Sequence, residues 1–312
     1  MTVPAISIIV PTYNRCEMLR RTLQSLLVQN FHDMSHEVIV VDNNSSDRTR
    51  EVVEEFIRAN PSDFRYAFEP QEGIPYARNK GLAEARAPII AFTDDDGFVD
   101  VDWAFQIKKN LDEHPEVSYL GGKVLAEWSH EPPAWLTVKH WSPLALADFG
   151  DKPFYIDLTN PICLITANFA CRREIIDEVG PFSLEFARCQ DHELQVRIWK
   201  AGKRGMYRPE IIVTADVPEE RLTKTYHRRW HRRHGFYMAK LREEDFEQSR
   251  TRFLDVPAPV YRRLISYTGR WLYSTITGNR DGAFTYETEL SFFLGYFQNR
   301  ISKYYKFSGN TP

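Results

Sequence analysis

A chain of 312 residues is long enough for one large domain or for a domain with a smaller appendage. Its composition is 43% hydrophobic, 27% charged and 13% aromatic, which is typical of a folded protein and excludes a disordered or fibrous chain. The formal net charge of −3 excludes a nucleic-acid binder that works by its overall charge.

The first part of the chain alternates predicted strands and helices. Short apolar runs at 5–11, 37–42 and 87–94 each end at a proline or an aspartate. Between them, apolar residues recur at helical spacing in 19–27 and 52–57. This alternation predicts an α/β fold with a central, mostly parallel sheet flanked by helices. A ligand of such a sheet lies beyond the carboxyl ends of the strands, which here lead into the polar loops 11–15, 42–47 and 94–97.

The middle of the chain is less regular. The segment from 121 to 160 is rich in Pro and Trp and has no regular hydrophobic periodicity, which predicts ordered loops over a site. The strand-like segment ICLIT (162–166) follows, then a helix from near Arg172 and another from near Asp191.

The tail after Pro257 predicts an amphipathic helix and then an aromatic, basic segment. The apolar stripe of the helix consists of Val260, Tyr261, Leu264, Ile265, Leu272 and Ile276. Arg262, Arg263 and Arg270 lie off that stripe. Two interpretations remain open, namely packing against the main domain or a second subunit, and peripheral contact with a membrane surface.

The cysteines and the apolar segments of the sequence indicate where in the cell we expect the protein. The four cysteines form no CxxC pair, and no apolar run reaches the roughly 18 to 20 residues of a spanning helix. The N-terminus MTVPAISIIV also lacks the basic start and long apolar middle of a signal peptide. We therefore expect a cytoplasmic protein, with a place at the inner face of the membrane left open.

Three adjacent carboxylates stand in the stretch AFTDDDG, and like charges this close repel one another. In an extended chain, residues i and i+2 point the same way, so Asp94 and Asp96 would face one ligand while Asp95 points elsewhere and is the least sensitive of the three. Two carboxylates on one side suit Mg²⁺ or Mn²⁺, which complete their coordination with water and substrate phosphates. The alternative is that these residues only cap the helix that follows. Gly97 gives the backbone room to turn.

Four segments resemble, in this order and spacing, the family 2 glycosyltransferases of the GT-A fold: ISIIVPTYNR, VIVVDNNSSDRT, EGIPYARNKGL and IIAFTDDDG. A weaker resemblance continues at NFACRREIIDEVGPFSLEFARCQDHELQVRIWKAG, on the acceptor side. The resemblance implies a GT-A catalytic domain over 1–218, with a nucleotide-sugar-binding half (1–121) and an acceptor-side half (122–218). A helical, basic and aromatic extension would occupy 219–312.

The resemblance also implies an inverting, metal-dependent glycosyltransferase of polysaccharide or glycoconjugate synthesis. Its cofactor would be Mn²⁺ or Mg²⁺, its donor a nucleotide-diphosphate sugar and its acceptor a glycan or a lipid-linked molecule, with no nucleic-acid partner. The residues assigned to the nucleotide-sugar are Pro11, Thr12, Tyr13, Asn14, Arg15, Asp42, Arg78, Asn79, Asp94 and Asp95, and those assigned to the metal are Asp94 and Asp96.

Two of these residues, Asp42 and Arg78, also have roles that follow from their own chemistry. The carboxylate of Asp42 can accept the imide N–H of uracil or thymine, which favours a UDP- or dTDP-sugar. Ser46 or Asp47 would cap the helix that follows Asp42. Arg78 has an alternative role as an ion-pair partner of the acidic triplet.

The catalytic base of the family is an acidic residue at the start of a helix, in a G-E-D-like motif. Here RCQDHELQVRI keeps the aspartate as Asp191 but carries Cys189 and Gln190 in place of Gly-Glu. Asp191 is therefore the expected base, with a plain N-cap role as the alternative and Glu193 as the reserve.

Further downstream, Asp216 is a candidate oxygen ligand near the place where family members often carry a histidine. Arg221 and His234 are candidate phosphate contacts in a stretch, 221–240, that carries no acidic residue. The alternative is a solvated or lipid-facing basic helix.

Two functions of other classes compete with glycosyl transfer. A non-catalytic nucleotide-sugar-binding relative would have lost the DxD motif or the base, and both are present. A phosphotransferase of haloacid-dehalogenase type has its nucleophilic aspartate in the first strand and Thr or Ser after the glycine, whereas here the motif comes later and Phe98 follows Gly97.

Overall fold

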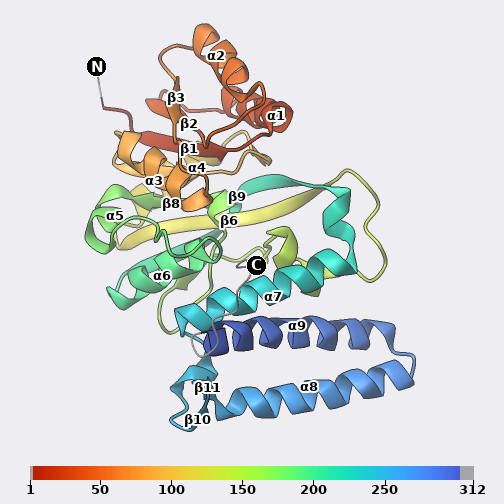
Figure 1. The fold of residues 1–312 in the computed structure, drawn as a ribbon. Coiled ribbons are helices and arrows are strands. Elements are labelled where there is room, and N and C mark those ends of the chain that lie inside the picture. The colour runs from red at the N-terminus through yellow and green to blue at the C-terminus, as the bar shows by residue number, and fades with distance from the viewer. Residues whose placement is uncertain (1–2, 303–312) are drawn as a thin grey trace. The chain divides into compact units, whose positions relative to one another are not determined.

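The computed structural model describes residues 3–302, which fall into two compact units. Within these residues, the first unit comprises 3–128 and 145–217, and the second comprises 129–144 and 218–302 (Figure 1). The sequence placed the corresponding boundary between 218 and 219. It also assigned 129–144 to the acceptor-side half, whereas this segment groups with the C-terminal unit.

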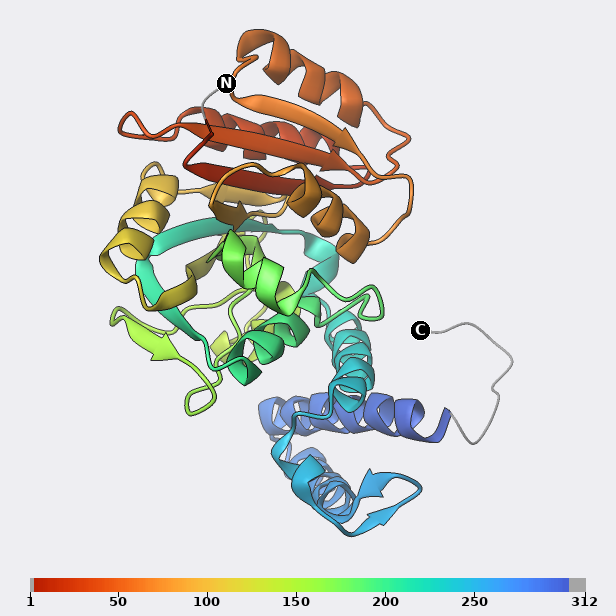
Figure 2. The same ribbon diagram turned by 90° about the vertical axis from the view of Figure 1, so that its left-hand side faces the viewer.

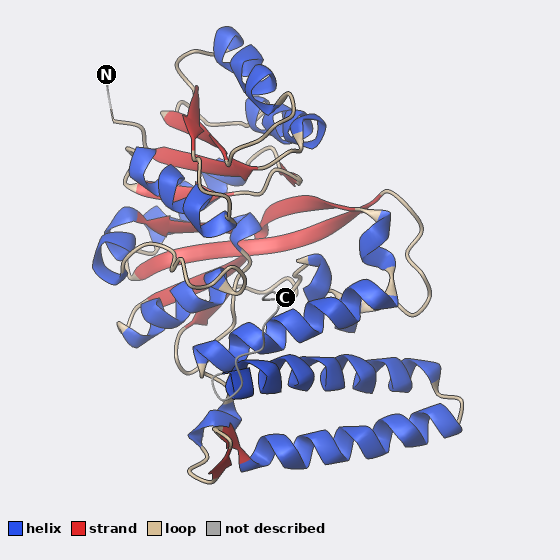
Figure 3. Cartoon of the chain, in the orientation of Figure 1, coloured by secondary structure: helices blue, strands red, loops and turns tan. Residues whose placement is uncertain are grey.

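The first half of unit 1 alternates strands and helices as the sequence predicts (Figure 3). Its strands lie in the order β3-β2-β1-β4, all parallel. In chain order the elements are β1 (Ile6–Thr12), α1 (Cys16–Leu27), β2 (His36–Asp42), α2 (Thr49–Ala59), β3 (Phe64–Phe68), α3 (Ile74–Glu84) and β4 (Ile89–Phe92). The register pairs Thr12 with Asp42, so these two strand ends lie at the same edge of the sheet.

The second half extends the same sheet with mixed directions. Beyond β4 the order continues β8-β6-β9-β5, with β7 also paired to β9; β6 and β9 are parallel, and the other pairs are antiparallel. The remaining elements are β5 (Gly97–Val99), α4 (Trp103–Glu113), β6 (Val117–Trp128), β7 (Phe154–Ile156), β8 (Phe169–Arg172), α5 (Arg173–Val179), α6 (Gln190–Lys200) and β9 (Arg204–Val217). The predicted α/β class is confirmed, with its parallel part concentrated in the first half.

The core of unit 1 lies between the sheet and its helices. β4 is buried along its whole length, and β1 and β2 almost so, because helices cover the sheet and the strands need no polar face. Their side chains join those of α1, α2 and α4 in one apolar cluster. The largest member is Trp103, whose indole N–H donates a buried 2.8 Å hydrogen bond to Oδ1 of Asn168.

Two expectations for the middle of the chain are wrong. Residues 162–165 form no strand; the strand of this region is β8, three residues after the predicted segment. The loop predicted from 121 onward is occupied up to Trp128 by β6. Gly121 and Gly122 serve close packing in this strand, since a Cβ at Gly122 would lie 1.9 Å from the carbonyl oxygen of Ile211.

Unit 2 is built on three long helices, α7 (Lys224–Leu241), α8 (Ala258–Ile276) and α9 (Arg280–Ser302). α9 lies between α7 and α8, as both ribbon views show (Figures 1 and 2). A Cβ at Gly295 would lie 1.7 Å from the carbonyl oxygen of Arg232, so α7 and α9 approach closely only because glycine stands there. A small hairpin of β10 (Arg252–Phe253) and β11 (Val256–Pro257) precedes α8.

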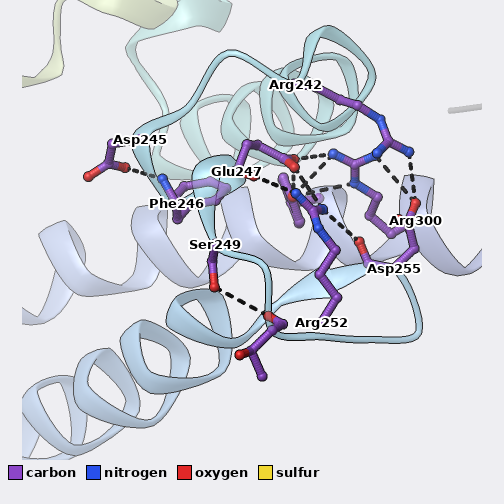
Figure 4. A network of polar contacts seen from close by, with 10 residues as sticks. Arg242, Asp245, Phe246, Glu247, Ser249, Arg252, Asp255 and Arg300 are labelled. Carbon is purple, nitrogen blue, oxygen red and sulfur yellow. Dashed lines mark hydrogen bonds and ion pairs between the residues drawn. The ribbon is translucent and has the colours of Figure 1, made fainter.

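A buried ion network ties this hairpin to α9 and α7 (Figure 4). Glu247, on the short 3-10 turn before the hairpin, forms ion pairs with Arg300 of α9 and, at 2.9 Å, with Arg252 of β10. Asp255 pairs with Arg242 at 2.8 Å and with Arg300 at 3.5 Å. The side chains of Glu247 and Arg300 are 5% and 2% exposed, so the charge of each must be compensated by its partners in this network.

Candidate active site

The three aspartates after β4 lie in a tight turn. The backbone N–H of Gly97 donates to the carbonyl oxygen of Asp94 at 3.1 Å, so the chain reverses between them and β5 begins at Gly97. A Cβ at Gly97 would lie 2.7 Å from Oγ1 of Thr93, which explains the glycine at this position.

Because of this turn, the three carboxylates do not point in the directions that an extended chain would give them. Nη1 of Arg15 lies 3.1 Å from a carboxylate oxygen of Asp95 and 3.1 Å from one of Asp96, whereas Asp94 accepts from Nη2 of Arg78 at 3.1 Å. Asp95 and Asp96 therefore share one guanidinium while Asp94 pairs with another, and which of the three carboxylates faces a ligand stays a prediction. Alternation of side chains holds in an extended strand and not in a reverse turn.

Asp95 is the most embedded member of the triplet. Its carboxylate accepts a 2.8 Å hydrogen bond from Oγ1 of Thr12, and its backbone carbonyl accepts one of 2.8 Å from Oγ1 of Thr22. Burial raises the pKa of Asp95 to about 6, against the opposing effect of the Arg15 charge. Asp95 thus joins the acidic turn to the end of β1 and to α1.

Arg15 and Arg78 offset the electrostatic repulsion between the three adjacent aspartates. Arg78, from α3, is 5% exposed and stacks its guanidinium 5.5 Å from the ring centre of Phe182. The ion-pair role that was open for Arg78 is thus observed with Asp94. Two cations stand against three carboxylates, which leaves this turn with a net affinity for positive charge.

The donor set of the turn fits a hard divalent cation. Asp94 and Asp96 present carboxylate oxygens with side chains 33% and 16% exposed. Within residues 3–302, no three His, Cys, Asp or Glu side chains gather as a closed metal site. An ion held here would therefore take its remaining ligands from water and from a bound diphosphate, as Mg²⁺ and Mn²⁺ commonly do.

The loops after β1 and β2 are fastened to each other beside this turn. Oδ1 of Asn14 accepts from the backbone N–H of Ser46 at 2.7 Å, and the backbone N–H of Asn14 donates to Oγ of Ser45 at 2.9 Å. Asn14 adopts a left-handed conformation with φ 53°, which asparagine tolerates well. Pro11 lies within β1, and Tyr13 is 45% exposed next to it.

Asp42 is held rigidly at the end of β2. Its carboxylate accepts 2.9 Å and 2.8 Å hydrogen bonds from the backbone N–H of Ser45 and from the hydroxyl of Tyr66. Burial, and then the hydrogen bond to Asp42, raise the pKa of Tyr66, so this phenol stays a donor. Sequence reasoning missed Tyr66, because no local signal places a β3 side chain against β2. Asp47, one of the two candidate caps, accepts from the backbone N–H of Thr49 at 3.0 Å in the first turn of α2.

Asn79 makes contacts that the sequence did not suggest. Its amide Nδ2 donates to the carbonyl oxygen of Phe182 at 2.8 Å, and its Oδ1 accepts from the Phe182 N–H at 2.9 Å. Both polar ends are thus engaged by one residue of the loop between α5 and α6. Asn79 fastens α3 to this acceptor-side loop, and a contact between Asn79 and a nucleotide stays a prediction.

Asp191 lies in the first turn of α6, where the predicted base belongs. Its Oδ1 accepts a hydrogen bond from the backbone N–H of His192 at 2.9 Å. Gln195, a residue the sequence did not single out, supports this turn by donating to the Asp191 carbonyl at 3.1 Å and to the Leu164 carbonyl at 2.7 Å. Cys189 precedes the helix in a left-handed conformation with φ 57°.

Glu193 has a different environment from Asp191. Both of its carboxylate oxygens are held by Arg197, at 2.8 Å from Nε and 2.9 Å from Nη2. Arg197 also donates to the carbonyl oxygens of Gly180 and Pro181, at 2.9 and 2.8 Å. A carboxylate fixed in this way stabilises the loop before α6 and is poorly placed to take a proton from another molecule.

Asp216 lies beside the acidic turn. Its backbone N–H donates to the carbonyl oxygen of Asp96 at 3.1 Å, and the neighbouring Ala215 pairs with Gly97 across β9 and β5. The structure therefore brings this candidate oxygen ligand next to the triplet. Arg221 and His234 belong to unit 2, and their contact with phosphate stays a prediction.

Comparisons with known proteins agree with this arrangement. The sequence model of "Glycosyl transferase family 2" matches residues 7–180. The chain is 26% identical over 211 residues to "Glycosyltransferase AglE" of Haloferax volcanii, a match that covers 68% of this chain and 66% of that one. It is 24% identical over 226 residues to the "Glucosyl-dolichyl phosphate glucuronosyltransferase" of the same organism, covering 69% and 70%.

Two solved structures share the fold. TarS of S. aureus, residues 1–349 in complex with UDP, has a TM-score of 0.56 and 18% identity over 96% of this chain and 91% of its own. The mannosyltransferase PcManGT of Pyrobaculum calidifontis, in complex with GDP-Man and Mn²⁺, has a TM-score of 0.62 and 18% identity over 98% and 88%.

Proposed function

The chain belongs to glycosyl transferase family 2, and from that membership we propose that it transfers a sugar from a nucleotide-diphosphate sugar to an acceptor hydroxyl with inversion. The observation that carries the proposal is the hydrogen bond between Thr12 and Asp95. It joins the loop predicted to hold the nucleotide to the acidic turn predicted to hold its diphosphate. Both lie at the carboxyl ends of parallel strands, where ligands of α/β sheets bind.

The donor proposal rests on Asp42. Its carboxylate is fixed by Ser45 and Tyr66 beside the loop of Pro11 to Arg15, and a fixed carboxylate can accept the imide N–H of uracil or thymine. We therefore favour a UDP- or dTDP-sugar. The neighbour TarS was solved with UDP, and PcManGT with GDP-Man.

The cofactor proposal is Mn²⁺ or Mg²⁺ at Asp94 and Asp96. When bound, such an ion supplies positive charge that stabilises the departing diphosphate. Arg78 holds Asp94 and Arg15 holds Asp96, at 3.1 Å each. A cation also accompanies the donor in the complex of PcManGT.

The proposed chemistry is a single displacement in which Asp191 is the base. Its carboxylate removes the proton of the acceptor hydroxyl, the oxygen bonds to the anomeric carbon, and the bond from that carbon to the diphosphate oxygen breaks. One displacement inverts the anomeric configuration and leaves Asp191 protonated. Glu193 does not share this role, because Arg197 holds both of its oxygens.

The acceptor is proposed to be a glycan or a lipid-linked molecule in polysaccharide or glycoconjugate synthesis. The name of one relative, a glucosyl-dolichyl phosphate glucuronosyltransferase, describes a lipid-linked substrate for that protein. A place at the cytoplasmic face of a membrane would suit such an acceptor and stays a prediction.

A screen of UDP-, dTDP- and GDP-sugars, each with Mn²⁺ and with a chelator, tests the proposal. We expect one donor class to raise the melting temperature only with the cation, because a ligand that binds the native state alone stabilises it. That donor should also be slowly hydrolysed, releasing the nucleoside diphosphate.

The alternative is a non-catalytic nucleotide-sugar-binding protein. It would show the same thermal shift, but neither hydrolysis of the donor nor transfer to an extract of glycolipids. A thermal shift by no donor would contradict both functions. Phosphotransfer of the haloacid-dehalogenase type is excluded by the family membership.

A further inference from the structure

α8 has two apolar faces, and only one of them is covered. Val260 and Leu264 belong to the core of unit 2, packed with side chains of α9. Ile265, Leu272 and Ile276 lie on the other face and are 74%, 48% and 83% exposed. The sequence merged these residues into one stripe, whereas the structure divides them between the core and the surface. Three large aliphatic side chains on one exposed helix face indicate an interaction surface.

The hairpin before α8 adds apolar residues at its tip. Phe253 is 66% exposed and Leu254 41% exposed, and the carbonyl of Phe253 accepts a 2.8 Å hydrogen bond from the Tyr261 hydroxyl at the start of α8. Leu254 and Asp255 both have positive φ, 50° and 62°, in a two-residue turn that normally favours Asn-Gly. Leucine is unfavourable in this left-handed turn, and its side chain adds apolar surface at the tip.

The surroundings of this surface are basic. Residues 256–280 contain no Asp or Glu. Arg262 is exposed on α8 one turn before Ile265, and the exposed Arg270 places its guanidinium 5.9 Å from the ring centre of Tyr286 on α9. The excess of basic over acidic residues extends to the whole of unit 2. The segments 129–144 and 218–312 carry 18 Lys and Arg against 11 Asp and Glu, whereas 1–128 and 145–217 carry 22 against 32. Such a unit favours an anionic partner.

We propose that the outer face of α8, with the hairpin tip at Phe253 and Leu254, is the surface by which the protein lies on an anionic lipid bilayer. Aliphatic side chains beside arginines are the features of a helix that lies in the plane of a membrane interface. Among residues 3–302, no helix combines the length and apolar content needed to cross a bilayer.

A second copy of the chain and the segment 303–312 both fit the positive charge of this face less well than an anionic bilayer does. In a symmetric contact with a second copy, the same basic face stands on both sides, so its arginines would repel one another. The segment 303–312 carries Lys303 and Lys306 and no acidic residue, so it too would add positive charge. An anionic bilayer supplies both the apolar layer and the opposite charge.

Co-sedimentation of the full chain with vesicles tests the proposal, without donor or metal. We expect binding to phosphatidylcholine vesicles that contain a quarter phosphatidylglycerol, weak binding to pure phosphatidylcholine, and weaker binding at high salt because exposed charges are screened. Ile265→Ser with Ile276→Ser should abolish binding. Arg262→Glu should weaken it by about tenfold or more, given about 1 kcal/mol for each basic residue near an anionic surface.

Val28→Ser is the matched control, since Val28 is 67% exposed in unit 1, at the end of α1, and should leave vesicle binding unchanged. Unchanged melting temperatures would show that all variants fold. Equal binding of the double variant and the wild type would overturn the proposal, as would equal binding to neutral vesicles or none to either kind. A dimer in light scattering that the double variant loses would assign the face to a second copy instead. None of these outcomes depends on glycosyl transfer.

Discussion

Thr12 donates a 2.8 Å hydrogen bond to the buried carboxylate of Asp95, across 83 residues of sequence. The contact makes the end of β1 and the acidic turn one structural element. The two cannot move apart without breaking a buried hydrogen bond to a carboxylate.

Replacing Thr12 by valine tests that link. The variant keeps the shape of the side chain but leaves the buried carboxylate without this donor, which costs about 1–3 kcal/mol of unfolding free energy. Chemical denaturation measures the loss, and Thr12→Ser, which restores a hydroxyl, should recover most of it. If valine and serine behave alike, the hydroxyl is not what stabilises Asp95.

Asp96 should be required for cation-dependent donor binding. We expect Asp96→Ala to abolish transfer and the dependence of nucleotide affinity on Mn²⁺, because one of two carboxylate ligands is lost while Arg15 keeps Asp95. Titration calorimetry with and without Mn²⁺ measures the effect. Asp112→Ala is the control, since that carboxylate is exposed on α4 and pairs with Lys108. Normal turnover of the Asp96 variant would remove it from the metal site.

The buried pair of Glu247 and Arg300 should dominate the stability of unit 2 (Figure 4). Glu247→Ala leaves a 2% exposed guanidinium with one partner fewer, and the expected cost is about 3–5 kcal/mol. A double variant with Arg300→Met should be less destabilised than the sum of the two single variants, because it removes both charges together. Urea denaturation of the four proteins completes the cycle, and strict additivity would show that the two side chains do not interact.

A cluster of aromatic rings and histidines in unit 2 should make its stability depend on pH. His227 is fully buried, with ring centres of Trp135 at 5.0 Å and His140 at 6.3 Å. Burial, and then the charge of His140, lower the pKa of His227 to about 4. The folded state therefore binds a proton less readily than the unfolded state, so stability is present at neutral pH and is lost as the pH falls from about 6.5 toward about 4.

The size of that effect can be measured by denaturation at neutral and mildly acidic pH. The shift corresponds to about 3 kcal/mol at 1.36 kcal/mol per pKa unit. His227→Phe keeps a ring among the aromatic side chains and should flatten this part of the pH profile. A variant with the same slope as the wild type would assign the pH dependence to other groups.

The sequence predicted three of the four parallel strands, β1, β2 and β4, because they are buried apolar runs that end in polar loops. It did not predict β3, of which only Phe64 and Ala67 are buried. Register then places Thr12 and Asp42 together without further information. It did not predict where the acidic side chains point, since a turn and an extended strand share one local composition. Nor could it place Tyr66 against Asp42, or separate the covered and open faces of α8, because those depend on which distant segments pack there.

Replacement of Asp191 should impair catalysis without changing donor binding. Asp191→Asn keeps the size of the side chain and its contact with the His192 N–H but removes the proton acceptor, so donor affinity should stay within about twofold while the turnover rate falls by about 10²–10⁴-fold, the usual contribution of a general base. Glu193→Gln is the matched control on the same helix turn; it should lose stability through Arg197 but retain transfer. Donor binding is followed by calorimetry and transfer by release of the nucleoside diphosphate. Full activity of Asp191→Asn would remove this residue from the mechanism, whereas loss of transfer in Glu193→Gln alone would make Glu193 the base, in spite of its two hydrogen bonds to Arg197.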